Sequence, residues 1–158
     1  MPSTLLDIGS CKNKILRLFS QSDEIKELLL GDQASAANAD SLLFANLFPY
    51  LYFDKSQTQE AAFLCVEADI PKLPSATVKN LKITLWAYCH TSFMSCQKAG
   101  LEGTRIDMLA DLADRLLDGS RDFGIGMLRL ESSSYFRPGD LYYGRKLVYT
   151  VPEFRTKG

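Results

Sequence analysis

The chain has 158 residues, with 18 basic against 19 acidic side chains, 46% apolar residues and a formal net charge of −1. This composition excludes a disordered, collagen-like or disulfide-stapled protein, and it predicts one domain that buries a core without metal or disulfide support. The near-zero net charge also argues against a protein that binds nucleic acid electrostatically over its whole surface.

Two further patterns predict a soluble, unsecreted protein with no membrane partner. The first residues lack the basic segment, apolar core and cleavage site of a secretory leader, and no apolar run approaches the roughly 20 residues that span a bilayer. The cysteines form no CxxC pair and stand in apolar or mixed surroundings: Cys11, Cys65, Cys89 and Cys96. Such cysteines are typical of reduced thiols in a cytosolic compartment.

The N-terminal part of the chain predicts helices. Apolar residues between Ile15 and Leu30 recur at spacings of three, four and seven, which suits an amphipathic helix. Ser20 followed by Asp23 resembles the start of a capped second helix, and Gly31 is a natural stop. We therefore expect two short helices or one kinked helix, followed by a loop over residues 32–41, which hold no large apolar side chain.

The middle of the chain predicts strands. Residues 47–53 are aromatic and β-prone, with Pro49 marking an edge or a bend. Residues 62–68 alternate as a strand does, and residues 79–90 give the clearest period of two. Because both faces of this last segment carry large side chains, including Trp86, we expect it to be the central strand with both sides covered.

Residues 105–118 predict the best-specified helix. Its apolar residues fall on one stripe, Thr104 and Asp107 can form a capping pair, and Gly119 closes it. Residues 124–135 and 142–151 then predict two strands of an antiparallel hairpin, joined by a turn at 137–140 that contains Pro and Gly.

The expected fold class is therefore α+β, with a mainly antiparallel sheet flanked by N-terminal helices and one amphipathic helix. No internal repeat, low-complexity tract or linker divides the sequence. We expect one domain over residues 1–158, with a helical N-terminal region at 1–31 and a core of sheet and helix at 60–155.

The chain offers few groups for catalysis. His90 is its single histidine, and Cys89 points to the opposite face of the same predicted strand, so the two cannot act as base and nucleophile. With Cys96 they supply at most three ligands, too few for a zinc finger or ribbon. Gly124 and Gly126 lack the sequence context of a dinucleotide loop. We expect no enzyme of familiar type, no metal and no cofactor.

A row of carboxylates is the most unusual feature of the predicted helix. Its members are spaced four, three and four residues apart, so they share one face: Asp107, Asp111, Asp114 and Asp118. Like charges at these spacings repel. The row is either a solvated surface, an acidic face for a basic patch on a neighbouring subunit, or the lining of a DNA passage. A divalent-cation site is a further alternative, although the loop geometry typical of calcium sites is missing. Nearby cations that would partly neutralise the row are Arg105, Arg115 and Arg121.

The predicted hairpin carries a second candidate surface. Tyr and Arg are enriched at the energetic centres of protein interfaces, and several cluster here. The basic and aromatic residues of this surface are Tyr135, Phe136, Arg137, Tyr142, Tyr143 and Arg145, followed by Phe154 and Arg155. The alternative is ordinary side-chain packing within a sheet.

Several segments resemble proteins of one viral group. Residues 103–107 with 112–126, and the ending 142–154, resemble neck or tail-completion proteins of tailed phages and prophages of Gram-positive bacteria. The resemblance also includes residues 65–71 and the strand through Trp86 and His90. It covers roughly residues 60–155.

Within that group the order of elements is similar to tail terminators. The resemblance implies a non-enzymatic protein that forms a ring, expected to be hexameric, which closes the end of the tail tube and docks it to the head connector. The implied partners are further copies of the chain, the tail tube protein and head–tail connector or adaptor proteins, with DNA only as passing cargo. The implied location is the virion, and the host cytoplasm during assembly.

A ring subunit must offer two different surfaces to its neighbours. The acidic helix face and the hairpin with Arg137 and Arg145 are candidates for these two surfaces; alternatively, the acidic face lines the lumen. Two other functions stay open. One is a head-completion or portal-to-tail adaptor ring, and the other is a small metal-dependent hydrolase or nuclease that uses the aspartate row.

Overall fold

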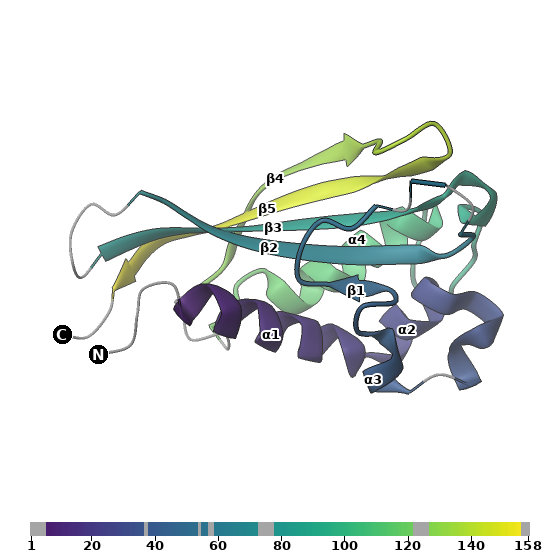
Figure 1. Cartoon of the computed structure of the whole chain (residues 1–158), viewed down its shortest axis with the longest axis horizontal. Coiled ribbons are helices and arrows are strands. Elements are labelled where there is room, and N and C mark those ends of the chain that lie inside the picture. The colour runs from purple at the N-terminus through teal and green to yellow at the C-terminus, as the bar shows by residue number, and fades with distance from the viewer. Residues whose placement is uncertain are drawn as a thin grey trace.

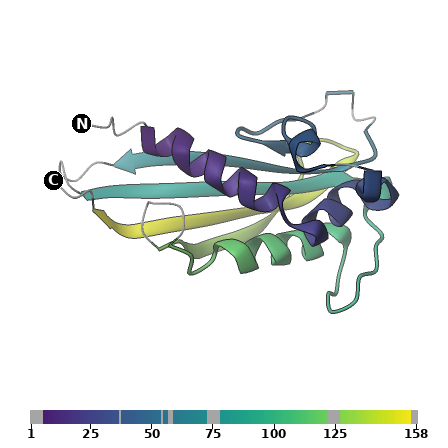
Figure 2. The ribbon, with the colours of Figure 1, turned by 90° about the horizontal axis from the view of Figure 1, so that it is seen from below.

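A computed structural model describes residues 6–36, 38–53, 55–56, 59–72, 78–121 and 127–155. One five-stranded sheet, in the order β1-β2-β3-β5-β4, carries the helices on one of its faces (Figures 1 and 2). The strands are β1 (Leu47–Phe48), β2 (Ala62–Lys72), β3 (Val78–His90), β4 (Arg129–Phe136) and β5 (Tyr142–Arg155). The helices are α1 (Leu6–Ser20), α2 (Asp23–Leu30), α3 (Ala39–Leu42) and α4 (Arg105–Leu117), with 3-10 turns at Gly31–Ala36 and Thr91–Phe93.

The α+β class and the mainly antiparallel sheet are confirmed. Among the described strands, the short β1 runs parallel to its neighbour β2, and the pairs β2–β3, β3–β5 and β5–β4 are antiparallel. Among the described residues, no helix combines the length and the apolar character needed to cross a bilayer.

Two N-terminal helices are present, but the second begins at a different cap from the one expected. Ser22, not Ser20, is the N-cap of α2, and its hydroxyl accepts a hydrogen bond from the Ile25 amide at 3.3 Å. Ser20 remains in the last turn of α1, where its hydroxyl donates to the Arg17 carbonyl at 2.8 Å. Gly31 ends α2 with φ = 62°, as expected for a glycine stop.

The predicted loop over residues 32–41 is wrong in part. A 3-10 turn occupies Gly31–Ala36, and the single helical turn α3 follows. Asn38 caps α3 by accepting a hydrogen bond from the Ser41 amide at 2.9 Å, and the helix delivers Leu42 into the core. A side-chain cap and one buried leucine thus outweigh a composition typical of loops.

The aromatic segment 47–53 forms much less strand than expected. Only Leu47 and Phe48 pair with β2, and the chain then crosses the sheet face opposite the helices. There its rings cover a second, aromatic cluster of buried side chains: Phe48, Phe63, Cys65, Tyr88 and Tyr142. The bend follows Pro49, which has no amide hydrogen for a ladder.

β3 is the central strand of the sheet, as predicted. Its alternate residues Leu81 to Cys89 enter the main core beneath α1, α2 and α4, while Tyr88 packs in the aromatic cluster on the other face. α4 also begins as predicted. The Thr104 hydroxyl accepts from the Asp107 amide, and the Asp107 carboxylate accepts from the Thr104 amide.

The C-terminal hairpin is present with a shorter first strand. β4 begins at Arg129, whereas the prediction began at Gly124; residues 122–126, including Gly124 and Gly126, lie outside the described residues. β4 is one edge of the sheet, and its side chains are exposed along the strand, with Phe136 half-buried.

Candidate functional site

The acidic face of α4 is held in place by contacts within the chain. Asp107 serves the capping box and also lies 3.9 Å from the Arg145 guanidinium of β5. Asp111 forms an ion pair with Arg115 at 2.7 Å, one helical turn along. Both aspartates remain partly exposed, so the face is a surface with partial internal neutralisation.

The other two aspartates connect α4 directly to the hairpin. Asp114 accepts a hydrogen bond from the Tyr149 hydroxyl at 2.6 Å, and Asp118 accepts one from the Leu130 amide at 2.8 Å. Burial and the adjacent Asp114 carboxylate raise the pKa of Tyr149 well above its ordinary value, so its hydroxyl remains a donor. The acidic face therefore belongs to the same side of the molecule as β4 and β5.

This placement brings together the acidic face and the hairpin, which the sequence presents as candidates for two different surfaces of a ring subunit. Figure 2 shows α4 running along the side of the sheet that ends in β4. Arg145 contacts Asp107 of its own chain and donates to the Ser133 hydroxyl. The two candidate surfaces therefore lie together on one side of the same chain.

Two of the predicted surface residues are buried. Arg105 is only 8% exposed; its guanidinium donates to the carbonyls of Phe93 and Leu28 at 2.7 and 2.9 Å and lies 3.7 Å above the Phe93 ring. It does not neutralise the acidic face. Tyr142 is fully buried in the aromatic cluster, because its side chain shares a sheet face with Tyr88. Neither residue can contact a neighbour from these positions.

The remaining predicted residues do reach the surface. Arg115 and Arg121 are exposed, and exposed Arg137 donates to the Asp140 carbonyl at 2.9 Å across the hairpin turn. Tyr143 is partly exposed and stacks on Tyr135 with ring planes 10° apart. The Tyr135 side chain is 70% exposed.

An exposed apolar group at the opposite edge was not anticipated. It lies around β1, beside α3 and at the start of the segment that crosses the sheet: Leu43, Phe44, Tyr50 and Leu51. The sequence pattern predicts β structure for residues 47–53 and no element for residues 42–46. The sequence feature that could have predicted this exposed group is the large number of aromatic residues after Leu42, because one edge strand cannot bury all of them.

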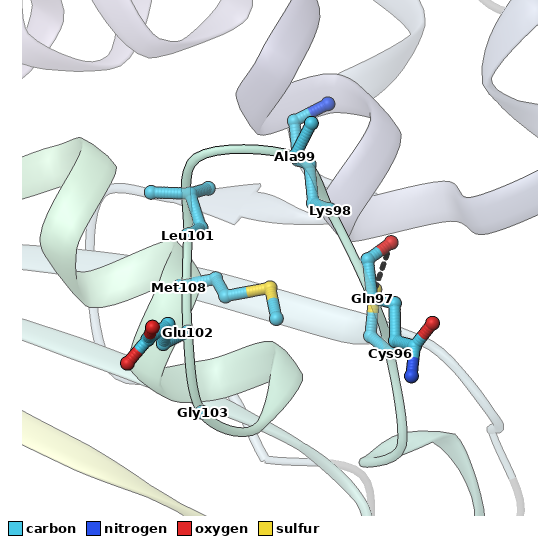
Figure 3. A pocket seen from close by; sticks show the side chains of 8 residues that line it. All are labelled: Cys96, Gln97, Lys98, Ala99, Leu101, Glu102, Gly103 and Met108. Carbon is cyan, nitrogen blue, oxygen red and sulfur yellow. Dashed lines mark hydrogen bonds between the residues drawn. The ribbon is translucent and has the colours of Figure 1, made fainter.

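A hollow of about 580 Å³ opens beside the start of α4. It is an open depression bordered by the loop that leads from the turn Thr91–Phe93 to α4, and Figure 3 shows the side chains of that loop and of Met108 around it. The lining residues are Cys96, Gln97, Lys98, Ala99, Leu101, Glu102, Gly103 and Met108. An ion pair between Lys98 and Glu27 of α2 fixes the loop.

The residues weighed for catalysis are held by ordinary packing contacts. Cys89 is fully buried with its sulfur 3.8 Å from that of Met94, whereas His90 is partly exposed and its Nδ1 lies 2.8 Å from the Ser92 hydroxyl. Burial raises the pKa of the Cys65 and Cys89 thiols to about 12. Within the described ranges, no three His, Cys, Asp or Glu side chains gather as a metal site would require.

Comparison with known proteins identifies a family for this chain. A family model named YomW matches residues 13–151, from α1 into β5, so it includes both the helical layer and the sheet. The name is of the type given to Bacillus phage and prophage proteins, which indicates a phage-related protein. No curated protein and no solved structure was found to match.

Proposed function

The chain belongs to the YomW family, and from this premise we propose that it is a structural protein of a phage neck. In this proposal identical copies form a ring, expected to be hexameric, that closes the tail tube and docks it to the head connector. The tail tube protein and the connector or adaptor proteins are its other partners, and DNA passes through the lumen as cargo. The protein then resides in the virion, and in the host cytoplasm during assembly.

The observation that carries this proposal is the position of the exposed apolar side chains. Among the described residues, the large ones fall into two groups at opposite edges of the sheet. The β1 group consists of Leu43, Phe44, Tyr50 and Leu51. The hairpin group consists of Leu130, Tyr135 and Leu141. β1 and β4, beside which the groups lie, are the first and last strands of the sheet.

Two different apolar edges favour a head-to-tail contact over a two-fold dimer. A two-fold interface joins one patch to its own copy and leaves the other patch in water. A head-to-tail contact buries the β1 group of one subunit against the hairpin group of the next, and a closed ring leaves neither group exposed. This supports a ring subunit on physical grounds that are independent of the family match.

The direct test is the native mass of the purified chain, measured alone and after mixing with the tail tube protein of the same phage. We expect a closed oligomer, of six copies, in at least one of the two conditions. A twelve-fold ring would instead favour a head-completion or portal-to-tail adaptor. A strict monomer in both conditions would contradict the proposal.

A further inference from the structure

The outer edge of β2 is covered by β1 over a short stretch. β1 pairs with Leu64 and Cys65, whereas β2 continues to Lys72 without a partner strand on that side among the described residues (Figure 1). The Leu64 amide donates to the Asn46 carbonyl at 2.8 Å, so it faces this edge. Because successive amides of a strand point to opposite sides, the Ala68 amide faces the same edge, beyond the end of β1.

A carboxylate closes the edge at this amide. The Oε1 atom of Glu67 accepts a hydrogen bond from the Ala68 amide at 3.0 Å, and the Lys12 ammonium of α1 donates to the same oxygen at 2.8 Å. Lys12 is itself fixed, since it also donates to the Pro49 carbonyl at 2.9 Å. The side chains of Lys12 and Glu67 are only 18% and 34% exposed, so water screens this ion pair less than an ordinary surface pair.

The ion pair passes around the edge from one face of the sheet to the other. α1 packs on the helical face, where Leu64 and Val66 enter the main core. Glu67 points to the opposite face, like Cys65 in the aromatic cluster, because side chains alternate along a strand. The Lys12 side chain therefore crosses the edge to reach the Glu67 carboxylate. Together the two side chains occupy the place of an added strand.

β4, at the other end of the sheet, has an open edge. Among the described residues it pairs with β5 alone, and Asp118 takes the amide of Leu130 near its start. Residues 132–136 follow with neither a charged residue nor a proline, the features that blunt natural sheet edges. Because the pairs β2–β3, β3–β5 and β5–β4 are each antiparallel, β4 runs opposite to β2. A second copy aligned head to tail would bring its β4 to β2 as an antiparallel neighbour.

We propose that the ion pair of Lys12 and Glu67 is an edge guard, which closes β2 to the β4 strand of a second copy. Without the guard, each chain has two open edges of matching direction, and head-to-tail pairing of such edges extends into a continuous sheet. With the guard, copies associate through side chains and not through the backbone of β2. This inference goes beyond the proposed ring and applies to a monomeric or an assembled wild-type chain.

The first experiment compares Glu67→Thr with Asp69→Thr. Threonine suits a strand, but its side chain is too short to join the Lys12 ammonium to the Ala68 amide. Asp69→Thr removes an exposed carboxylate from the same strand and leaves the guard in place. In sedimentation velocity, Glu67→Thr should give at least tenfold more material above the wild-type size, and Asp69→Thr should match the wild type.

Lys12→Met tests the other half of the guard. Methionine keeps an apolar stem and removes the ammonium, so the Glu67 carboxylate loses its anchor. We expect polymers from this variant as well. Glu67→Thr and Lys12→Met shift the net charge in opposite directions, so an increase shared by both cannot come from net charge. The thermal unfolding midpoint of each dilute variant shows that it is folded, and Lys12→Met decides the question if Glu67→Thr does not fold.

A peptide identifies the strand that the guard excludes. A fluorescent peptide with the sequence of residues 130–136 should bind to Glu67→Thr and to Lys12→Met, with a rise in anisotropy, and should not bind to the wild-type chain. The same peptide with alternate amides N-methylated cannot form a ladder and should bind to none of them.

The outcomes decide between the guard and its alternatives. Folded Glu67→Thr and Lys12→Met chains that keep the wild-type size and do not bind the peptide overturn the guard. Equal polymerisation of Asp69→Thr also overturns it, since that variant retains the ion pair. Polymers that form without peptide binding overturn β4 as the excluded strand. The native mass of the wild-type chain tests the ring separately, because each variant is compared only with the wild-type size.

Discussion

Gly144 in β5 shows how one residue can determine the packing of the sheet centre. It pairs with Tyr88 of β3 on one side and with Phe136 of β4 on the other. A Cβ atom added there would lie 2.0 Å from the Ala87 carbonyl oxygen and 2.5 Å from the Tyr88 Cβ. Because the first of these neighbours is backbone of the central strand, no side-chain movement relieves the overlap.

We therefore expect Gly144→Ala to lower the free energy of unfolding by about 3 kcal/mol, at the upper end of overpacking effects. Urea titration followed by circular dichroism measures it. Gly9→Ala is the matched control, since Gly9 lies in α1 with open space around its Cβ position. That change should raise stability by about 0.5 to 1 kcal/mol. Equal changes in the free energy of unfolding for Gly144→Ala and Gly9→Ala would show that Gly144 does not pack closely against β3.

The buried thiols make stability depend on alkaline pH. Burial raises the pKa of Cys65 and Cys89 to about 12 in the folded chain, whereas the ordinary value is 9.0. Above pH 9 the unfolded chain therefore loses protons that the folded chain retains. The stability is fully present below pH 9 and falls between pH 9 and 12, by up to about 1.4 kcal/mol per pH unit for each thiol.

The measurement is the free energy of unfolding in urea at pH 7, 9.5 and 10.5, under reducing conditions. Replacing both residues by alanine should reduce the slope above pH 9, although the chain will be less stable at every pH because of the cavities. Tyr149, which is retained, contributes in the same direction, so some slope should remain. A double variant with the wild-type slope would refute the assignment to the thiols.

At the scale of elements, Arg105 joins three of them. It is the first residue of α4, and its guanidinium binds the Leu28 carbonyl in the last turn of α2 and the Phe93 carbonyl that ends the adjoining 3-10 turn. The positively charged Arg105 guanidinium also lies at the negative C-terminal end of the α2 dipole, where a cation is stabilising. This one side chain positions the start of α4, and with it the hollow and the acidic face.

We expect Arg105→Met to lower the free energy of unfolding by about 3 kcal/mol, since it removes charge-assisted hydrogen bonds and leaves two carbonyls with poorer partners. Arg115→Met, which removes only a surface ion pair with Asp111, should cost less than about 0.5 kcal/mol. Urea titration of both variants gives the comparison. A similar loss of unfolding free energy in Arg105→Met and Arg115→Met would mean that Arg105 contributes no more than a surface cation does.

At the scale of the whole molecule, the arrangement is a sheet with helices on one face and two chemically different edges. The β1 side presents the exposed apolar side chains Leu43, Phe44, Tyr50 and Leu51, and the β4 side presents Leu130, Tyr135 and Leu141. The proposed ring follows from this two-sidedness, and native mass tests it.

The sequence by itself determined the features that depend on neighbouring residues. The α+β class, the central strand at 79–90, the Thr104–Asp107 capping pair and the aspartate row on one helix face could all be predicted. Each rests on a period of two or 3.6 residues, or on a cap that acts within one turn, and local backbone geometry is enough to specify these.

Only the tertiary structure decided which side chains face a neighbour. Arg105 and Tyr142 appear as surface candidates in the sequence and are buried, because carbonyls and rings from distant segments surround them. The acidic face and the hairpin share one edge because Asp118 and Asp114 bind β4 and β5. Phe44 is exposed at the other edge, in a left-handed turn in which its amide donates to the Leu47 carbonyl. Such placements depend on contacts between residues far apart in the chain, which no local pattern records.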